Sequence, residues 1–397
     1  MTARGVTGSA GTVLDVLADG LPRSAAEIGR RASLPRSTVV HTLLRLSADG
    51  QVMQHAPVQQ GRGRPSRRWS VARPPGPILV VVSGAHGATS GVVSADGRLL
   101  ASSGPTPSEA GERSVEAVLG GADAVLAAAG VGAGDLSLAV VGLPGASSFD
   151  RTPGSPAVQE RGSGALLRMF RTWQDQDPVT VLGRHLGRPA YSENDANLAV
   201  LGEAESGAGR GRSTVLYVGL LHGTGAGLVV AGALHRGRSR LAGEIGHLHT
   251  DDDGRLCHCG ARGCFWQSRS VPALLVELSE AHGRSYTAAD LADAAAADDH
   301  DVVRALTGLG HALGRRLADG LVFLDPDAIV VDSGLGRASE VIADGIRQSL
   351  DRCAPPTMAR ATEVLLAEHG ADAPLVGAAA LARREGLLTP DPATRLG

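Results

Sequence analysis

The sequence predicts a mixed α/β protein in which a small N-terminal domain precedes a body made of two similar lobes. Three observations predict it. Residues 1–75 carry 11 arginines against four acidic residues, whereas the remainder carries 27 arginines against 37 acidic residues. Short amphipathic segments followed by two strand-like runs fill the basic head. Two strand–turn–strand patterns, starting about 135 residues apart, indicate a duplicated α/β unit in the acidic body.

The composition argues against a membrane protein and against a disulfide-bonded secreted protein. The 397 residues suffice for two or three domains, and 43% hydrophobic residues support sizeable cores. No apolar run reaches the roughly 18 residues of a membrane span, and Asp15 and Asp19 interrupt the first apolar stretch. We therefore expect a cytoplasmic protein with no membrane partner. Three of the four cysteines lie within residues 257–264, unlike the dispersed framework of a disulfide-bonded secreted protein.

The head begins as a helix-turn-helix. Ser24 and Glu27 have the spacing of a capping box at a helix start, and Pro35 suits the first position of the next helix, which Asp49-Gly50 ends. In that second helix we expect an apolar side toward a core, formed by Val40, Leu43, Leu44 and Leu46. The other side is polar and cationic and consists of Arg36, Ser37, Thr38, His41, Thr42 and Arg45. The start of such a helix reads base edges in the major groove.

A cationic hairpin follows. Residues 51–54 and 68–71 read as two strands, and the segment between them is dense in arginine. Its Arg62-Gly63-Arg64-Pro65 resembles the core of an AT-hook, which fits the A·T minor groove. An arginine-rich linker is the alternative. We predict a winged helix-turn-helix over residues 1–75 that binds double-stranded operator DNA. Its predicted DNA contacts are Arg36, Ser37, Thr38, His41, Arg45, Arg62, Arg64 and Arg67.

The body opens, after a proline-rich linker at residues 74–77, with the apolar strand of residues 78–83, a turn and a partner strand at residues 91–93. The same pattern recurs from Ser213 to Val230, with Gly223, Gly225 and Gly227 in its turn. Two such units predict two lobes with a ligand cleft between them.

Three thiols and an imidazole indicate a metal site. Cys257, Cys259 and Cys264 fall within eight residues, and His247 lies ten residues upstream of the first. This set suits a closed tetrahedral Zn²⁺ site with a structural role, because no coordination position is left for water. His258 is the rival fourth ligand, and a set of reduced, buried thiols is the alternative interpretation.

Several segments together resemble the ROK family (repressors, open reading frames and kinases), over nearly the whole chain. Residues 220–247 carry the spaced glycines and end in Gly243-Glu244-Ile245-Gly246-His247, and residues 192–197 read Ser-Glu-Asn-Asp-Ala-Asn. Shorter matches are Gly142-Leu143-Pro144-Gly145, Asp325-Pro326-Asp327 and Gly377-Ala378-Ala379.

The resemblance implies a two-lobed actin-like or hexokinase-like (ribonuclease H-like) body. Lobe 1 would span residues 76–200, with a C-terminal helix at about 376–390 returning to it, and lobe 2 with the zinc site would span 201–375. The resemblance also implies a Cys3His zinc site that includes His247. In the family, Asp195 would be the catalytic base, and Asn194, Glu244 and His247 would hold sugar hydroxyls.

Departures from the family pattern argue against phosphoryl transfer. The kinases open with Asp-x-Gly-Gly-Thr, where this chain has Val82-Ser83-Gly84-Ala85-His86. Valine cannot organise Mg²⁺, and Leu221-His222 depart from the second glycine loop. Trp266 replaces a sugar-binding glutamate, so we expect it to offer a stacking face to the ligand. Asp195 would then be a vestigial base.

The predicted function is a sugar-responsive or sugar phosphate-responsive transcription regulator, a repressor, that acts as a homodimer or homotetramer and is not an enzyme. A dimer is expected because a helix-turn-helix pair reads two half-sites. One alternative is a ROK sugar kinase that uses Asp195 as base and carries an appended DNA-binding head. The other is a DNA-binding architectural protein whose body only dimerises.

Overall fold

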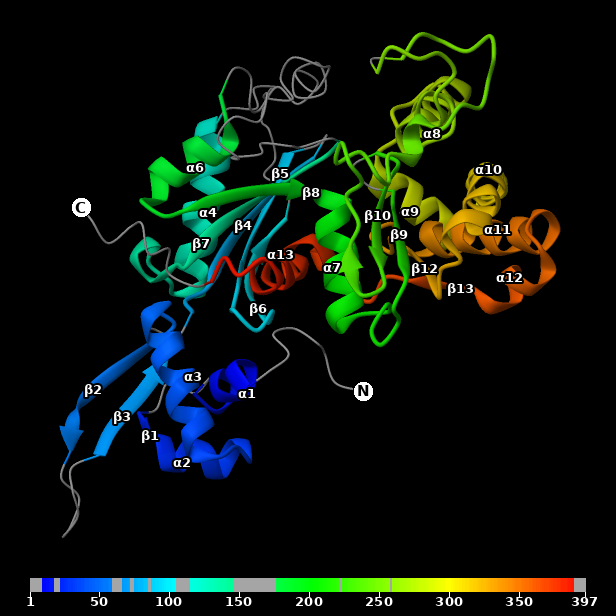
Figure 1. Ribbon diagram of the computed structural model, residues 1–397. Helices are drawn as coiled ribbons and strands as arrows, with labels where there is room; N and C mark the ends of the chain where they lie inside the picture. Colours follow the sequence, from blue (N-terminus) through cyan, green and yellow to red (C-terminus); the bar gives the residue numbers. More distant parts are fainter. Residues whose placement is uncertain are drawn as a thin grey trace. The chain divides into compact units, whose positions relative to one another are not determined.

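The computed structural model describes residues 9–17, 22–58, 66–71, 75–84, 87–104, 115–145, 176–220, 223–257 and 259–388. They form two compact units (Figure 1). The smaller unit contains the residues up to Gly76 and those from Ala382 on, and the larger unit runs from Pro77 to Leu381.

The described part of the small unit consists of helices and one antiparallel sheet. In chain order its elements are α1 (Ser9–Leu17), β1 (Arg23–Ser24), α2 (Ala25–Ala32), α3 (Arg36–Ala48), β2 (Val52–Val58) and β3 (Ser66–Val71). The strand order is β1-β3-β2. Trp69 on β3 is buried in the same apolar core as Val13, Ile28 and Leu43 of the helices. The arrangement of helices and hairpin is consistent with the predicted winged helix-turn-helix.

The local signals that delimit α2 and α3 act largely as predicted. The Ser24 hydroxyl accepts a hydrogen bond from the Glu27 backbone N–H, and the Glu27 carboxylate accepts one from the Ser24 N–H, which closes the capping box. Hydrogen bonds from Ser24 lower the pKa of Glu27. Ser33 ends α2 in the left-handed conformation at φ 54°. Pro35 is the residue just before α3 rather than its first residue.

The predicted core face of α3 is partly wrong. Val40 and Leu44 are 40% and 53% exposed, and the buried positions are Val39, Thr42, Leu43 and Leu46. The helix is therefore rotated relative to the prediction by about one residue, or about 100°. Burying Thr42 is tolerated because its hydroxyl pairs with the Ser9 hydroxyl at 2.9 Å.

The hairpin strands are longer than predicted, and their register places Val52 opposite Val71 and Gln54 opposite Trp69. Arg67 is exposed. Arg62 and Arg64, the centre of the predicted minor-groove contact, lie outside the described residues.

The larger unit begins with lobe 1. Its elements are β4 (Ile78–Gly84), β5 (Gly87–Val93), β6 (Leu99–Ser103), α4 (Val115–Ala129), the 3₁₀ turn η2 (Ala133–Asp135), β7 (Leu138–Leu143), α6 (Pro178–Leu186), β8 (Ala190–Asn194) and α7 (Asp195–Ser206). The strand order is β6-β5-β4-β7-β8. β4, β5 and β6 pair antiparallel, whereas β4, β7 and β8 pair parallel.

Lobe 2 follows. Its strands are β9 (Val215–Gly219), β10 (Gly225–Val230), β11 (Ala233–Leu234), β12 (Ala328–Val331) and β13 (Glu363–Leu366). Its helices are α8 (Val271–His282), α9 (Ala288–Ala296), α10 (His300–Leu324), α11 (Arg337–Cys353) and α12 (Pro356–Ala361), and the chain then continues into α13 (Ala373–Arg384), which packs against α7 and β5 of lobe 1. Three 3₁₀ turns are η5 (Ile245–His247), η6 (Phe265–Gln267) and η7 (Gly370–Asp372).

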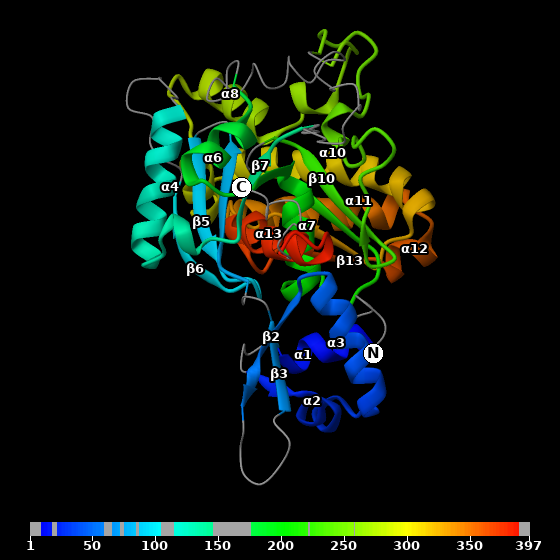
Figure 2. The same ribbon diagram turned by 60° about the vertical axis from the view of Figure 1, so that its left-hand side comes forward.

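The two lobes repeat one plan, which confirms the predicted duplication. The lobe 2 sheet has the order β11-β10-β9-β12-β13, again with an antiparallel triplet joined to a parallel triplet. Figures 1 and 2 show the two sheets side by side, with α7 and α13 between them.

These two helices cross closely. A Cβ on Gly377 of α13 would lie 1.7 Å from the carbonyl oxygen of Leu198 on α7, so only glycine permits the approach. α7 follows β8 of lobe 1 but packs on β9 and β10 of lobe 2. Leu375 of α13 contacts Gly91 on β5. The start of α7 therefore lies where the two lobes meet.

None of the helices that the structure describes combines the length and apolar character needed to cross a membrane.

Candidate metal centre and ligand site

The four predicted metal ligands lie together. One ligand atom from each of His247, Cys257, Cys259 and Cys264 falls within 4.8 Å of all the others. The sulfur of Cys257 lies 3.6 Å from Nδ1 of His247, and the sulfurs of Cys259 and Cys264 are 3.5 Å apart. His258, the rival ligand, lies outside the described residues.

The local backbone explains why these ligands converge. Cys257 N–H donates to the Ala261 carbonyl at 2.7 Å, which closes a tight loop, and Cys264 pairs with His249 in an isolated bridge. A Cβ on Gly263 would lie 1.7 Å from the Asp251 carbonyl oxygen, so this turn requires glycine. Phe265, only 1% exposed, anchors the loop in the apolar core of lobe 2.

The thiols behave as a metal-binding set. Burial favours a higher pKa for Cys257, but hydrogen bonds from the Cys259 backbone, the Trp266 indole and the neighbouring thiols outweigh it and lower that pKa. Burial and the neighbouring Cys259 and Cys257 thiols raise the pKa of Cys264 to about 12. Without a metal, the thiolate form of Cys257 is thus favoured and that of Cys264 is disfavoured. A divalent cation would stabilise the thiolate form of all three cysteines by neutralising their negative charge. The donor set fits Zn²⁺.

His247 joins the thiols to a pair of carboxylates. Its Nδ1 faces Cys257, whereas its Nε2 lies 3.9 Å from a carboxylate oxygen of Glu244. Coordination through one ring nitrogen fixes the orientation of the other. The imidazole can therefore present Nε2 toward Glu244 in a defined direction.

Glu244 and Asp195 approach each other from different lobes. Burial, and then the negative charge of Asp195, raise the pKa of Glu244 to about 7. Asp195 is the first residue of α7, and its carboxylate accepts a hydrogen bond from the Ala196 N–H at 2.8 Å. Two acidic side chains held this way suit the recognition of hydroxyl groups.

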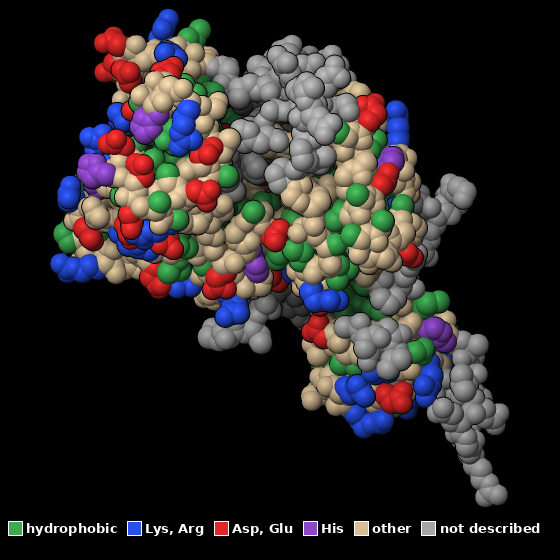
Figure 3. All heavy atoms as spheres, turned by 180° about the vertical axis from the view of Figure 1, so that it is seen from behind, with side chains coloured by type: hydrophobic (Ala, Val, Ile, Leu, Met, Phe, Trp, Pro, Cys, Tyr) green, Lys and Arg blue, Asp and Glu red, His purple; other side chains and the backbone are tan. Residues whose placement is uncertain are grey.

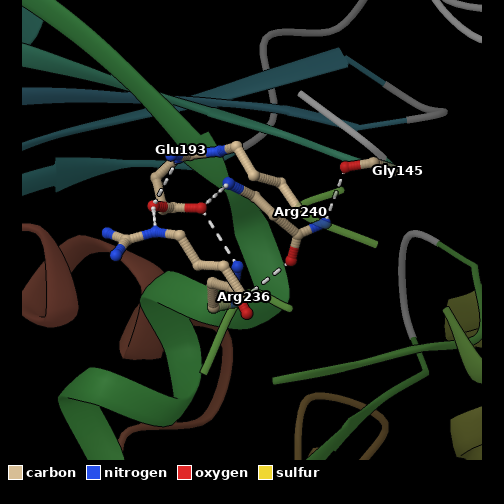
Figure 4. Close-up of polar contacts among 6 residues, drawn as sticks. Gly145, Glu193, Arg236 and Arg240 are labelled. Atoms are coloured by element: carbon tan, nitrogen blue, oxygen red, sulfur yellow. Dashed lines mark hydrogen bonds and ion pairs between the residues drawn. The ribbon is translucent and has the colours of Figure 1, made fainter. Parts of the chain in front are cut away.

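Both polar atoms of the Asn194 side chain make hydrogen bonds within the protein. Its side-chain oxygen accepts from the Asn197 N–H and caps α7, and its Nδ2 donates to the Gly145 carbonyl, each at 2.9 Å (Figure 4). One amide N–H remains for a ligand hydroxyl.

Trp266 has a role at the metal centre that the sequence did not predict. Its indole N–H donates to the sulfur of Cys257 at 3.2 Å. Such a donor stabilises thiolate charge and orients the ligand. The stacking contact expected for Trp266 stays a prediction.

The predicted DNA-binding residues on α3 lie on one exposed side of the helix. Arg36, Ser37, His41 and Arg45 are exposed, Thr38 is half-buried, and α3 contains no acidic residue. Figure 3 shows basic side chains outnumbering acidic ones on the visible face of the small unit, whereas both kinds are interspersed on the larger unit.

Two buried side chains, those of Val82 and Asp332, lie near the carboxyl ends of β4 and β12. Val82 on β4 is 3% exposed and packs beside Gly142. Asp332, which follows β12 and is 4% exposed, accepts hydrogen bonds from the Leu220 N–H at 3.2 Å and the Gly334 N–H at 2.9 Å. Sequence reasoning missed Asp332, because only the fold reveals its amide partners. Ala85, His86, Leu221 and His222 lie outside the described residues.

Comparison with known sequences identifies the family and several relatives of this chain. Residues 84–385 match the profile of the ROK family. The glucokinase of Thermotoga maritima is 29% identical over 245 residues, which are 57% of this chain and 77% of the glucokinase. The xylose repressor of Bacillus spizizenii is 29% identical over 222 residues, which are 56% of this chain and 58% of the repressor. The match thus spans little more than half the repressor's length.

Among solved structures, a ROK family transcriptional regulator described as a homolog of the E. coli MLC protein superimposes with a TM-score of 0.68. The superposition covers 96% of each chain at 21% identity. At this identity the likeness concerns the fold alone.

Proposed function

The chain belongs to the ROK family, and from this premise we propose that it is a transcription regulator, a repressor whose larger unit has lost kinase activity. It binds operator DNA through the small unit and a sugar or sugar phosphate through the larger one. It acts in the cytoplasm as a homodimer or homotetramer, because two helix-turn-helix units read two half-sites about one helical turn apart.

The observation that carries the proposal is the exposed side of α3. Arg36, His41 and Arg45 can reach bases and phosphates from a helix that follows a tight turn. The exposed Val40 and Leu44, which would be unfavourable in water, suit contact with thymine methyl groups. Arg62, Arg64 and Arg67 of the hairpin would bind the adjacent minor groove or its phosphates.

The effector site would comprise Asp195, Glu244 and His247, with Asn194 and Trp266 beside them. The carboxylates would accept from ligand hydroxyls, and Nε2 of His247, which lies 3.9 Å from Glu244, would be oriented by coordination of the other ring nitrogen. Zn²⁺ held by His247, Cys257, Cys259 and Cys264 would be structural and would fix this imidazole. Ligand binding would favour one arrangement of the lobes and thereby change operator affinity.

Kinase activity would be lost because the phosphate side of the site is unsuited to Mg²⁺·ATP. Val82 supplies no oxygen ligand. The buried carboxylate of Asp332 already occupies two backbone amides at the ends of parallel β9 and β12, where a phosphate would need them. Its negative charge would also repel the nucleotide.

A sugar kinase with an appended DNA-binding head is the second candidate. The presence of Asp195 and the match to glucokinase favour it. In that case Asp195 would take the proton from the attacking sugar hydroxyl.

Two assays on the full chain separate these functions. Incubation with sheared genomic DNA followed by sequencing of retained fragments should recover a small set of sites, and a sugar panel should release or tighten them. Coupled measurement of ATP consumption with Mg²⁺ and the same sugars should give no sugar-dependent signal. Sugar-dependent turnover would establish the kinase, and retained sites that no sugar affects would favour the architectural protein.

A further inference from the structure

Glu193 on β8 is a buried acidic residue with four hydrogen-bonding partners. One carboxylate oxygen accepts from Nε of Arg236 at 2.7 Å and from a guanidinium NH2 of Arg240 at 3.3 Å. The other accepts from the Asn194 N–H at 2.9 Å and from Nδ2 of Asn197 at 3.0 Å. Figure 4 shows the two arginine side chains converging on this carboxylate.

These partners come from both lobes. Glu193, Asn194 and Asn197 belong to β8 and α7, which continue the lobe 1 chain, whereas Arg236 and Arg240 lie between β11 and η5 of lobe 2. The Glu193 side chain is 3% exposed, and those of Arg236 and Arg240 are 21% and 34% exposed. Separating the lobes would break both ion pairs of this carboxylate, so the ion pairs favour the closed arrangement of the lobes.

The backbone at Arg240 gives an independent indication that this contact has a functional role. Its φ is 56°, in the left-handed region that L-residues other than Asn and Asp rarely adopt. Strained conformations of this kind persist where surrounding contacts hold them and gather at functional sites. The side chain of Arg240 makes the ion pair with Glu193.

On both sides of this contact, the residues that follow in the chain belong to the candidate ligand site. Asn194 and Asp195 follow Glu193, and Glu244 and His247 follow Arg240 by four and seven residues. We propose that Glu193, Arg236 and Arg240 form an inter-lobe cluster that sets the equilibrium between closed and open lobes. Glu193 is its positioning residue. The cluster's part in effector response rests on the proposed function, whereas the cluster itself can be tested without any effector.

Hydrogen–deuterium exchange on the ligand-free full chain tests the cluster, because the informative change appears in the lobe that was not altered. Glu193→Gln keeps the size of the side chain but removes its charge, and it should raise amide exchange rates at least about threefold in residues 235–244 of lobe 2. Arg236→Gln with Arg240→Gln should produce the reciprocal increase in residues 190–197 of lobe 1.

Two further variants complete the test. Arg238→Gln is the matched control, because Arg238 is exposed in the same segment, and it should leave residues 190–197 unchanged. Replacing Arg236 and Arg240 by lysine keeps the charge and should restore at least half of the protection. Exchange that rises only in the substituted segment, or rises equally in the Arg238 control, would overturn the proposal. Absence of operator binding by the wild-type chain, with these reciprocal changes intact, would instead count against the proposed function alone.

Discussion

Glu244→Gln should stabilise the larger unit at high pH, because the wild-type carboxyl is held in an environment that disfavours its charge. Burial and Asp195 raise the pKa of Glu244 from 4.5 to about 7. The folded chain therefore binds this proton more tightly than the unfolded chain does. The free energy of unfolding contributed by this group consequently falls as pH rises from about 4.5 to about 7, and is constant above that.

The magnitude follows from the size of the shift. Each pKa unit is about 1.4 kcal/mol, so the full penalty on ionised Glu244 is about 3 kcal/mol, of which about 2 kcal/mol develops between pH 5.5 and pH 8. Glutamine resembles the protonated form and escapes this penalty. The Tm of Glu244→Gln relative to wild type should therefore increase by roughly 4 °C over the same pH interval.

Thermal unfolding of both proteins, followed by tryptophan fluorescence at constant zinc, measures this difference. Asp195→Asn is the informative control, since removing its charge should reduce the pH dependence of the wild-type chain in the same direction but by less. A Tm difference between Glu244→Gln and wild type that stays constant from pH 5.5 to pH 8 would show that the pKa of Glu244 is not raised as described.

Three further predictions concern the metal centre, the DNA interface and the helix crossing. Cys259→Ser should lower bound zinc well below one ion per chain by metal analysis, whereas Cys353→Ser, at an exposed cysteine outside the cluster, should leave it unchanged. Arg45→Ala should weaken operator binding and reduce the slope of log affinity against log salt by about one, if its guanidinium contacts a phosphate; an unchanged slope would place Arg45 away from the backbone. Gly377→Ala should destabilise the larger unit by about 3 kcal/mol or more in denaturant unfolding, because its Cβ would overlap the Leu198 carbonyl. Gly308→Ala, in a helix with open space around the new methyl group, should instead stabilise by about 0.5–1 kcal/mol, and equal effects of the two would contradict the crossing.

Local chemistry made much of the fold predictable from sequence. The capping box of Ser24 and Glu27 depends on residues three apart, so its signal is complete within one turn. The duplicated strands were visible as apolar runs followed by glycines. The core face of α3 was harder, since Val39 and Val40 have the same apolar character and only packing decides which is buried.

In the candidate site, too, features that depend on close sequence spacing could be predicted, whereas contacts between distant residues could not. The clustering of the four candidate metal ligands could be predicted because cysteines at close spacing are rarely explained otherwise. The contact of Arg236 and Arg240 with Glu193 could not be predicted, since 43 and 47 residues separate them and arginines are common in this chain. The hydrogen bond from the Trp266 indole to the Cys257 sulfur also could not be predicted, because sequence spacing does not determine the distance between these side chains.

The most direct test of the whole account is a titration of the purified full chain against a fluorescent duplex recovered from the genomic selection, at about 0.15 M salt. The account predicts saturable binding that exceeds binding to a scrambled duplex by roughly 10³-fold or more. It also predicts that at least one sugar or sugar phosphate shifts the midpoint by about tenfold without consuming ATP. Equal affinity for both duplexes, or a midpoint that no member of the panel moves, would contradict it.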